Sequence, residues 1–257
     1  MHGPWAVVAG ASEGIGAAFS RELARRGFKL VLLARRRAPL DALAAELNTE
    51  VVVHTVDLGT DDALEEIRGV TDALDIGLLI YNAAFSPIGP FLDVPLAQRL
   101  KVIDVNCKAP VRLLDHFATR MVQRGSGGLL IMSSMSGFQG SALVATYAAS
   151  KAFLMVLGES LWEELQPANV DVLVCVAGAT LTPGFQDNTP ADRQSSAFPM
   201  TADAVATGAL ARIRKGPTWI PGAVNQAAHV LFGRLLPRAT AVRFISGKTR
   251  ELYGDKE

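Results

Sequence analysis

The strongest constraint on the fold is the alternation of two kinds of segment along the chain. Short apolar, β-branched runs recur between longer segments whose apolar residues repeat with helical period. Several short runs are apolar throughout, which is typical of parallel strands buried on both faces. The expected strands are Trp5–Ala9, Lys29–Ala34, Val51–Val56, Gly77–Tyr81, Gly128–Ser133, Asp171–Val176 and Thr218–Ile220. The expected helices are Gly14–Arg26, Leu40–Leu47, Asp61–Val70, Leu96–Gln123, Thr146–Leu165 and Asp203–Arg214.

This βαβα order predicts an α/β fold: a Rossmann-like, doubly wound parallel sheet of about seven strands. The chain has 257 residues, 49% of them hydrophobic, which suffices to cover both faces of one such sheet. We find no linker, repeat or low-complexity segment that would divide residues 1–257, so a single domain is expected. Right-handed crossovers bring the carboxyl ends of the strands to one edge, where a ligand is expected.

Two regions depart from the alternation. Gly178–Met200 is polar and longer than an ordinary connection, which predicts a lid with Phe185 and Phe198 as its apolar contacts. Residues 222–253 have helical period and a broad apolar face. We interpret this C-terminal helical extension as core, subunit interface or lid, with attachment to a membrane surface as the alternative.

Composition indicates which classes of partner and which cellular compartment to expect. The 25 basic and 25 acidic residues balance, which argues against a nucleic-acid partner. Cys107 and Cys175 lie far apart and the four histidines form no cluster, so neither a disulfide nor a metal is expected. There is no signal-peptide pattern, and no apolar run approaches the roughly 18 residues of a spanning helix. We therefore expect a cytoplasmic protein without a transmembrane segment.

A glycine-rich turn follows the first expected strand. Gly10, Gly14 and Gly16 have the spacing GxxxGxG and immediately precede or open the first expected helix. Glycines permit close approach of the backbone to a pyrophosphate, and a helix N-terminus offers unpaired N–H groups. The spacing alone also fits a structural tight turn. Its place on the first strand-to-helix turn favours a dinucleotide site.

Tyr147 and Lys151 form a YxxxK pair on an expected helix, where residues i and i+4 share one face. The pKa of a free tyrosine is about 10 and must fall by about three units for proton exchange at neutral pH, which costs about 4 kcal/mol. One ammonium about 4 Å away, at an effective dielectric of about 20, supplies about that much. Because a YxxxK pair more often lies on a protein surface, the residues around it must decide whether this pair belongs to a catalytic site.

Three further polar residues lie near the expected ligand edge. Ser134 follows the expected fifth strand, thirteen residues before Tyr147, and Asn82 follows the fourth. Asn106 is a polar residue among apolar ones in an expected helix. Ser136 is an alternative hydroxyl.

Taken in this order, these residues resemble the short-chain dehydrogenase/reductase family over nearly the whole chain. The matching motifs are Gly10, Gly14 and Gly16; Asn82-Ala83-Ala84; Asn106; Ser134; and Tyr147 with Lys151. The resemblance implies an NAD(P)-dependent alcohol dehydrogenase or carbonyl reductase of short-chain type. Ala9, Ala84 and Ala177 stand where the family usually has Thr, Gly and Pro, which affects cofactor affinity rather than reaction class.

The resemblance also implies a role for each catalytic residue. Tyr147 would exchange the proton of the substrate oxygen while hydride passes to or from the nicotinamide. Ser134 would hold that oxygen, and Asn106 would position a water for proton relay. Lys151 would lower the pKa of Tyr147 and bond the nicotinamide ribose. The cofactor-binding residues implied are Gly10, Ser12, Glu13, Gly14, Ile15, Gly16, Arg35, Asp57, Asn82, Ala83, Tyr147, Lys151, Gly178 and Thr182.

The end of the second strand predicts that NADP(H) is preferred over NAD(H). A site selective for NAD places an acidic residue there, whereas this chain has Arg35-Arg36-Arg37. Three cations before a helix N-terminus are unfavourable unless an anion binds them, and a 2′-phosphate is such an anion. In related NADP-preferring enzymes the first Arg after this strand makes the contact, so the resemblance implies that role for Arg35, and Ser12 would add a hydroxyl contact to the same phosphate. The alternative is a solvated basic run.

The sequence leaves the substrate open. Apolar residues near the site favour an apolar small-molecule carbonyl or alcohol, such as a steroid-like, acyl-chain or aromatic compound. These residues are Phe85, Pro87, Ile88, Phe138, Leu143 and Val144. Apolar-faced helices predict a homodimer or homotetramer. Two alternatives are a catalytically silent NADP(H)-binding regulator, which would be expected to lack one of the four catalytic residues, and a redox-neutral epimerisation or elimination.

Overall fold

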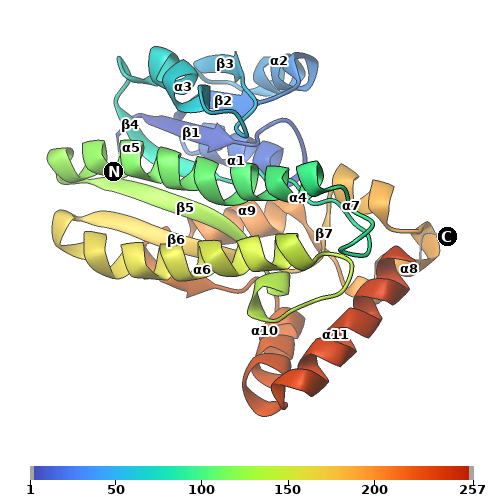
Figure 1. Ribbon diagram of the computed structural model, residues 1–257. Helices are drawn as coiled ribbons and strands as arrows, with labels where there is room; N and C mark the ends of the chain where they lie inside the picture. Colours follow the sequence, from blue (N-terminus) through green and yellow to red (C-terminus); the bar gives the residue numbers. More distant parts are fainter. Residues whose placement is uncertain (1–2, 255–257) are drawn as a thin grey trace.

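A computed structural model describes residues 3–254 (Figure 1). Its centre is a seven-stranded parallel sheet in the order β3-β2-β1-β4-β5-β6-β9, which confirms the predicted fold class. The strands are β1 Trp5–Ala9, β2 Lys29–Ala34, β3 Val51–Thr55, β4 Ile76–Tyr81, β5 Gly127–Ser134, β6 Val170–Ala177 and β9 Thr218–Trp219. The helices that flank the sheet are α1 Gly14–Arg25, α2 Arg37–Glu46, α3 Ala63–Thr71, α5 Ala109–Arg124, α6 Ala145–Leu165 and α9 Ala202–Leu210.

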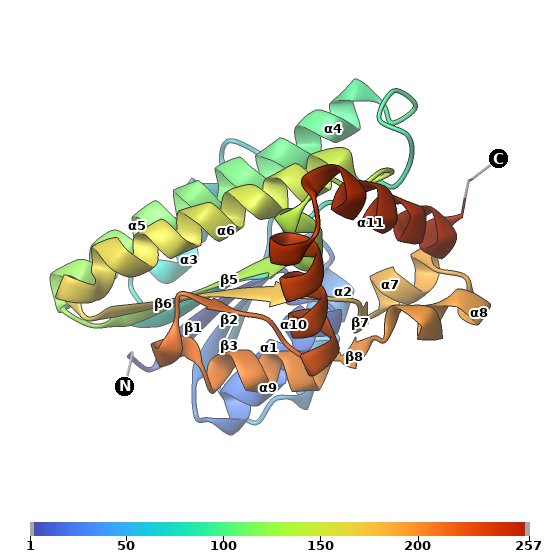
Figure 2. The ribbon, with the colours of Figure 1, turned by 90° about the horizontal axis from the view of Figure 1, so that it is seen from below.

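Helices cover both faces of the sheet because successive strand residues point to opposite sides. In β1, Val7 and Ala9 belong to the core under α3, α5 and α6, whereas Ala6 and Val8 belong to the core under α1, α2 and α9. Figure 2 shows these two helical layers on either side of the sheet. The apolar pattern of these strands is therefore explained by the burial of both faces of the sheet, as expected.

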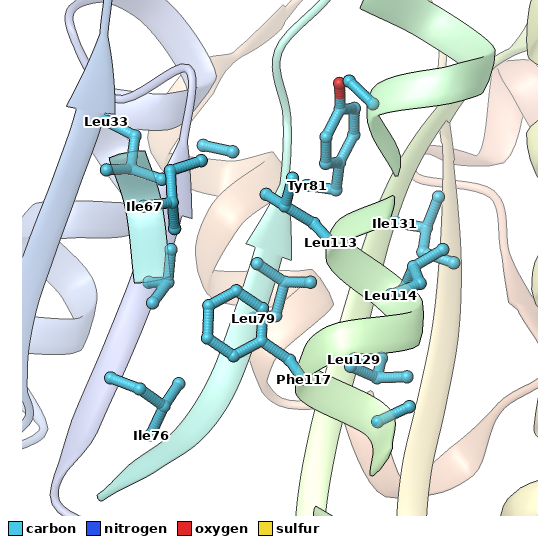
Figure 3. Close-up of a cluster of buried hydrophobic side chains, with 14 of the residues drawn as sticks. Leu33, Ile67, Ile76, Leu79, Tyr81, Leu113, Leu114, Phe117, Leu129 and Ile131 are labelled. Atoms are coloured by element: carbon cyan, nitrogen blue, oxygen red, sulfur yellow. The ribbon is translucent and has the colours of Figure 1, made fainter. Parts of the chain in front are cut away.

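One core fixes α5 against the centre of the sheet (Figure 3). Leu113 and Phe117 of α5 and Leu79 of β4 are fully buried in it. Burial of each such side chain stabilises the fold by about 1.5–3 kcal/mol. At the carboxyl end of β4, the buried Tyr81 donates its hydroxyl to the carbonyl oxygen of Val105 at 2.5 Å. The helix before α5 is thereby tied to the edge of the sheet where the strands end.

The strand order reverses between β1 and β4. The chain winds outward from β1 to β3 on one side and from β4 to β9 on the other. The connections that leave β1 and β4 at their carboxyl ends therefore diverge, and such a switch point leaves a crevice that α/β proteins use for ligands.

The helix expected over Leu96–Gln123 is interrupted. It consists of α4 (Leu96–Ile103), a π-helical turn (Asp104–Lys108) and α5. Pro110, in the first turn of α5, has no N–H to donate to the carbonyl of Asn106, so an unbroken α-helical ladder is not possible there. The interruption places Asn106 in the widened turn. The second expected helix also begins earlier, at Arg37, because Pro39 is tolerated in a first helical turn.

The two regions that break the alternation contain more structure than the sequence indicated. In Gly178–Met200, β7 (Thr180–Leu181) and the following short helices α7 (Pro183–Asn188) and α8 (Ala191–Gln194) precede β8 (Met200–Thr201), and β7 pairs with β8. Residues 222–253 form α10 (Ala223–Val230), a π-helical turn (Leu231–Leu235) and α11 (Arg238–Tyr253). Within residues 3–254, no helix is long and apolar enough to cross a bilayer.

Candidate functional site

The carboxyl ends of the strands gather the polar residues that the sequence analysis selected. Arg35 directly follows β2, and Asp57 lies just beyond β3. Asn82 follows β4, Ser134 ends β5 and Gly178 follows β6. All of these positions are at one edge of the sheet because the strands are parallel.

The glycine turn after β1 is packed too closely to admit side chains. Gly10 has a φ of +82°, and a β-carbon there would lie 2.7 Å from the backbone of Ala83. A β-carbon on Gly16 would lie 1.9 Å from the carbonyl oxygen of Gly10. Asn82 braces the turn from β4, because its Nδ2 donates to the same carbonyl at 2.9 Å. These contacts fix the turn that leads into α1.

A cavity of about 710 Å³ extends along this edge. The predicted cofactor residues that line it are Gly10, Ser12, Glu13, Gly14, Ile15, Arg35, Asp57, Asn82, Ala83, Tyr147 and Thr182. Glycine backbone and the N-terminus of α1 suit a pyrophosphate, and the volume falls within the range of about 300–1,000 Å³ usual for ligand pockets. The residues present therefore fit a dinucleotide. Gly16 lies behind the turn and supports it.

The three arginines after β2 differ in their partners. Arg36 pairs with Glu13 at 2.5 Å and Arg37 pairs with Asp41 at 2.8 Å. Arg35 lines the cavity and has no ion-pair partner among the described residues. The structure thus leaves a single cation of this run unneutralised at the cavity wall, and it is the one that the sequence analysis ranked first.

Asp57 has a carboxylate held in its charged form. Burial acts to raise its pKa, but hydrogen bonds from the amide of Gly59 and from Lys101 outweigh burial and, with the charge of Arg35, lower the pKa. Lys101 donates to Asp57 at 3.0 Å. An acceptor with fixed orientation therefore borders the cavity beyond β3.

A second cavity, of about 380 Å³, adjoins the first. Ile15, Asn82, Tyr147 and Thr182 line both. Ser134, Lys151 and Gly178 line the second alone. Its apolar wall comprises Ile88, Met132, Met135, Val144, Phe185 and Leu252. An apolar molecule in this cavity would share the wall formed by Tyr147 with a ligand of the larger cavity.

Tyr147 lies in the first turns of α6, next to Ser134. Burial raises the pKa of Tyr147 to about 12, and a side-chain hydrogen bond with Ser134 acts to lower it. Ser134 is thus the neighbouring hydroxyl that acts on the phenol, and its choice over Ser136 as the catalytic hydroxyl stays a prediction. Ser136 instead bonds Ser134, through its amide at 3.2 Å. The phenol is therefore protonated at neutral pH.

Lys151 lies one helical turn further along α6 and is almost fully buried. Its Nζ donates to the carbonyl oxygen of Met132 at 2.8 Å and lies 5.5 Å from the centroid of the Tyr147 ring. Burial lowers the pKa of Lys151 to about 8. Burial dominates the pKa of the phenol in this geometry, where the ammonium is directed at the carbonyl of Met132, and the expectation that Lys151 depresses the pKa of Tyr147 stays a prediction.

Asn106 is fully buried in the π-helical turn and lines neither cavity. Its Oδ1 accepts from the amide of Phe85 at 2.8 Å, and its Nδ2 donates to the carbonyl of Phe85 and the hydroxyl of Ser150. Both donors of its amide are thus occupied. The side chain links the segment after β4 to α6, while its predicted role in holding a water stays a prediction.

The segment after β6 closes one side of both cavities. Thr182 caps α7 by accepting from the amide of Phe185 at 3.2 Å, and Phe185 lines the second cavity. Gly178 contacts the side chain of Asn225 in α10, where a β-carbon would lie 2.5 Å from its Oδ1. The prediction that Phe198 is an apolar contact of the lid is wrong for this conformation, because its side chain is 68% exposed and lines neither cavity. Its backbone is left-handed, with a φ of +48°.

Sequence reasoning missed the contribution of α11. Thr249, Leu252 and Tyr253 line the second cavity. Their spacing on one face of a helix was the available signal, but nothing in the sequence indicated which surface that face would meet. Of the predicted lining residues, Val144 and Ile88 lie on the second cavity, whereas Phe138 packs against His229 of α10 with ring centroids 4.0 Å apart.

Comparisons with known proteins show the family of the chain. Residues 4–193 match the family model described as short chain dehydrogenase. The chain is a short-chain dehydrogenase/reductase. It is 33% identical over 229 residues to a 7β-hydroxysteroid dehydrogenase of Clostridium sardiniense, covering 88% of both chains. The family makes this protein an oxidoreductase that uses a nicotinamide cofactor.

Two solved structures place the similarity over almost the whole fold. One belongs to work on 7β-hydroxysteroid dehydrogenase stereoselectivity; it has a TM-score of 0.90, 27% identity, and coverage of 95% of this chain and 97% of that one. The other is a short-chain dehydrogenase from Sphingobium yanoikuyae in complex with NADPH, with a TM-score of 0.75, 31% identity, and coverage of 91% and 96%. The first alignment spans more of the chain than the family model, which ends before α9, α10 and α11.

Proposed function

We propose that this short-chain dehydrogenase/reductase uses NADP(H) to interconvert a bulky apolar ketone and its secondary alcohol. The observation that carries the proposal is the position of Tyr147, whose side chain lines both the cavity that fits a dinucleotide and the adjoining apolar cavity. A proton donor at that junction serves a reaction between a cofactor and an apolar carbonyl compound.

The residues around Tyr147 supply the acid/base part of this chemistry. The bound nicotinamide would supply or accept the hydride. The protonated phenol of Tyr147 donates its proton to the carbonyl oxygen in reduction, and Ser134 holds that oxygen by a hydrogen bond. Lys151, charged at neutral pH, would stabilise the phenolate that remains and would bond the ribose of a bound nicotinamide cofactor. Asn106 keeps the segment after β4 and α6 in register, through Phe85 and Ser150.

The preference for NADP(H) rests on Arg35. A 2′-phosphate needs a cation that is not already neutralised, and Arg35 meets that condition while Arg36 and Arg37 have carboxylate partners. The relative from Sphingobium yanoikuyae that was solved with NADPH lends support. Glu13, which pairs with Arg36, would hold that guanidinium at the cavity wall.

The substrate class follows from the second cavity. Its wall of aliphatic, methionine and aromatic side chains favours a compound with a large apolar surface. The similarity to 7β-hydroxysteroid dehydrogenases points to a hydroxysteroid or its ketone as the first class to test.

The test measures absorbance of the cofactor with a panel of steroid ketones and small ketones. We expect turnover of at least one bulky ketone, and kcat/KM for NADPH at least about tenfold above that for NADH, because a charge-assisted bond contributes about 1.5–3 kcal/mol. Arg35→Ala should remove this preference, whereas the matched control Arg37→Ala, which is paired with Asp41, should keep it. Equal use of NADH by the unmodified protein would contradict the cofactor assignment.

A further inference from the structure

The helical pair at the C-terminal end of the chain has an apolar corner that the fold leaves uncovered. Figure 1 shows α10 and α11 projecting from the body, with the turn between them at the point furthest from the sheet. That turn carries Leu231, 44% exposed, and Leu235, 70% exposed. Phe244 of α11 is 48% exposed, and its ring stacks on that of Phe232 in the turn with the ring centroids 4.8 Å apart. We call Val230, Leu231, Leu235 and Phe244 the apolar corner.

The charge around the apolar corner is strongly one-sided. Residues 222–250 contain five basic residues, Arg234, Arg238, Arg243, Lys248 and Arg250, and no acidic residue, although the whole chain is neutral; the acidic residues Glu251, Asp255 and Glu257 all follow in the sequence. Arg234 and Arg243 directly precede Leu235 and Phe244 in the sequence, are exposed and have no ion-pair partner among residues 3–254. Exposed leucine and phenylalanine flanked by unpaired arginine are the features of a helix that lies in a bilayer interface.

We propose that the apolar corner docks on the surface of an anionic phospholipid bilayer. Leu231 and Leu235 would enter the boundary between headgroups and acyl chains, while Arg234 and Arg243 contact lipid phosphates. A second copy of this chain fits less well, because an isologous contact would bring the same arginines of both copies together. The proposal does not depend on the proposed function.

The projecting helices are anchored firmly enough to transmit such contact. Arg238 donates to the carbonyl of Phe138 at 2.6 Å, and Ser246 accepts from the amide of Ala142 at 3.0 Å. Further along α11, the hydroxyls of Thr249 and Ser141 are 2.7 Å apart. The helix that begins at the apolar corner thus ends at the wall of the second cavity. A docked molecule would hold that cavity at a fixed position relative to the bilayer.

The experiment is co-sedimentation of the full chain with vesicles. One set contains equal parts of phosphatidylcholine and phosphatidylglycerol, and the other contains phosphatidylcholine alone. We expect binding to the anionic set to be at least about tenfold stronger and to weaken with salt. Arg234→Gln and Arg243→Gln should each weaken it by about fivefold. The double variant Leu231→Ser/Leu235→Ser should weaken it by at least about tenfold.

Two control variants test whether the effect belongs to this corner. Leu92, 85% exposed, and Lys215, also exposed, lie outside the C-terminal helical pair. Leu92→Ser and Lys215→Gln should bind vesicles like the unmodified protein. The proposal is overturned if the unmodified protein does not sediment with anionic vesicles, or if the corner variants bind as it does. It is also overturned if the leucine variant changes only the molar mass in light scattering, which would identify a contact between copies.

Discussion

Tyr147 and Lys151 have the helical spacing that the sequence predicts, yet each is directed by its surroundings. The hydroxyl of Ser134 acts to lower the pKa of the phenol, and the ammonium donates to the carbonyl of Met132. Their titration ranges are therefore separated, because burial raises the pKa of the phenol to about 12 and lowers that of the ammonium to about 8. At neutral pH Tyr147 is therefore a neutral phenol that can donate a proton, and Lys151 is a charged ammonium. Carbonyl reduction requires both of these states.

The pH dependence of reduction follows from this separation. Lys151 is charged below its pKa of about 8 and neutral above it, whereas Tyr147 stays protonated to about 12. We expect kcat/KM for the ketone with NADPH to be level near neutrality and to fall about tenfold per pH unit above about pH 8. Lys151→Arg should move any such decline to higher pH, since guanidinium does not titrate there. A profile that stays level to about pH 10 would show that Lys151 does not set the limb.

At the scale of single residues, the sequence predicted which residues lie at the site better than it predicted what each of them contacts. Ser134, Tyr147, Lys151 and the glycine turn lie on the two cavities because strand ends and helix periodicity determine their positions. Asn106 is different, since the bonds of its amide to Phe85 depend on a π-helical turn. The local sequence pattern predicts a helix there but does not distinguish a π-helical turn from an α-helical one.

At the scale of elements, the segment Gly178–Met200 is the part of the site with the least regular structure. It has short helices and a small sheet of two strands, each two residues long. Its helix α8 is linked to α11, because Arg193 donates to the carbonyl oxygen of Glu251 at 2.9 Å. We propose that this segment acts as a lid. Thr182 and Phe185 line the cavities from one side, so closure over a ligand would bury them further.

Hydrogen exchange tests the lid. Amides of α7 and α8 should exchange more slowly with NADPH bound than without it, because ligand contacts through Thr182 favour the closed arrangement. Amides of the central strands β1 and β4 serve as the internal reference and should change little. Equal exchange of the segment in both states would remove the lid from the account.

The elements that the sequence predicted least well are those whose form depends on distant partners. The seven strands of the central sheet were predicted to within a residue or two because most of them are buried and apolar along their length, whereas the short strands β7 and β8 were not predicted. The packing of α11 depends on Ser246 and Thr249 meeting residues 141–142, which lie about a hundred positions away in the sequence. No local pattern encodes such a contact, so the place of Tyr253 in the second cavity was not foreseen.

At the scale of the whole molecule, the helices α4, α5 and α6 carry a set of exposed apolar residues. These are Leu96, Leu100, Val111, Val122, Phe153 and Val156. Their spread over neighbouring helices is more than scattered surface apolar residues would give, and supports the prediction of a homodimer or homotetramer. The apolar corner between α10 and α11 is a separate surface with a separate proposed occupant.

Light scattering tests the oligomer. The unmodified protein at micromolar concentration should have at least twice the 27.3 kDa of one chain. Val156 is 63% exposed on α6, so Val156→Asp should shift the mass toward that of one chain without unfolding it. Leu235→Asp, on the apolar corner, is the matched control and should leave the mass unchanged. A single-chain mass for the unmodified protein would contradict the prediction.

The most direct test of the account is the rate of ketone reduction by Tyr147→Phe, measured together with NADPH binding. The change deletes only the hydroxyl at the junction of the two cavities, so the variant should bind NADPH nearly as the unmodified protein does. Its kcat should fall by a factor of about 10²–10⁴, the usual contribution of a general acid. The matched control is Tyr253→Phe, which removes the other phenol that lines the second cavity and should keep turnover. A Tyr147→Phe variant that retained more than about a tenth of the rate would show that another group donates the proton, and the central claim would be wrong.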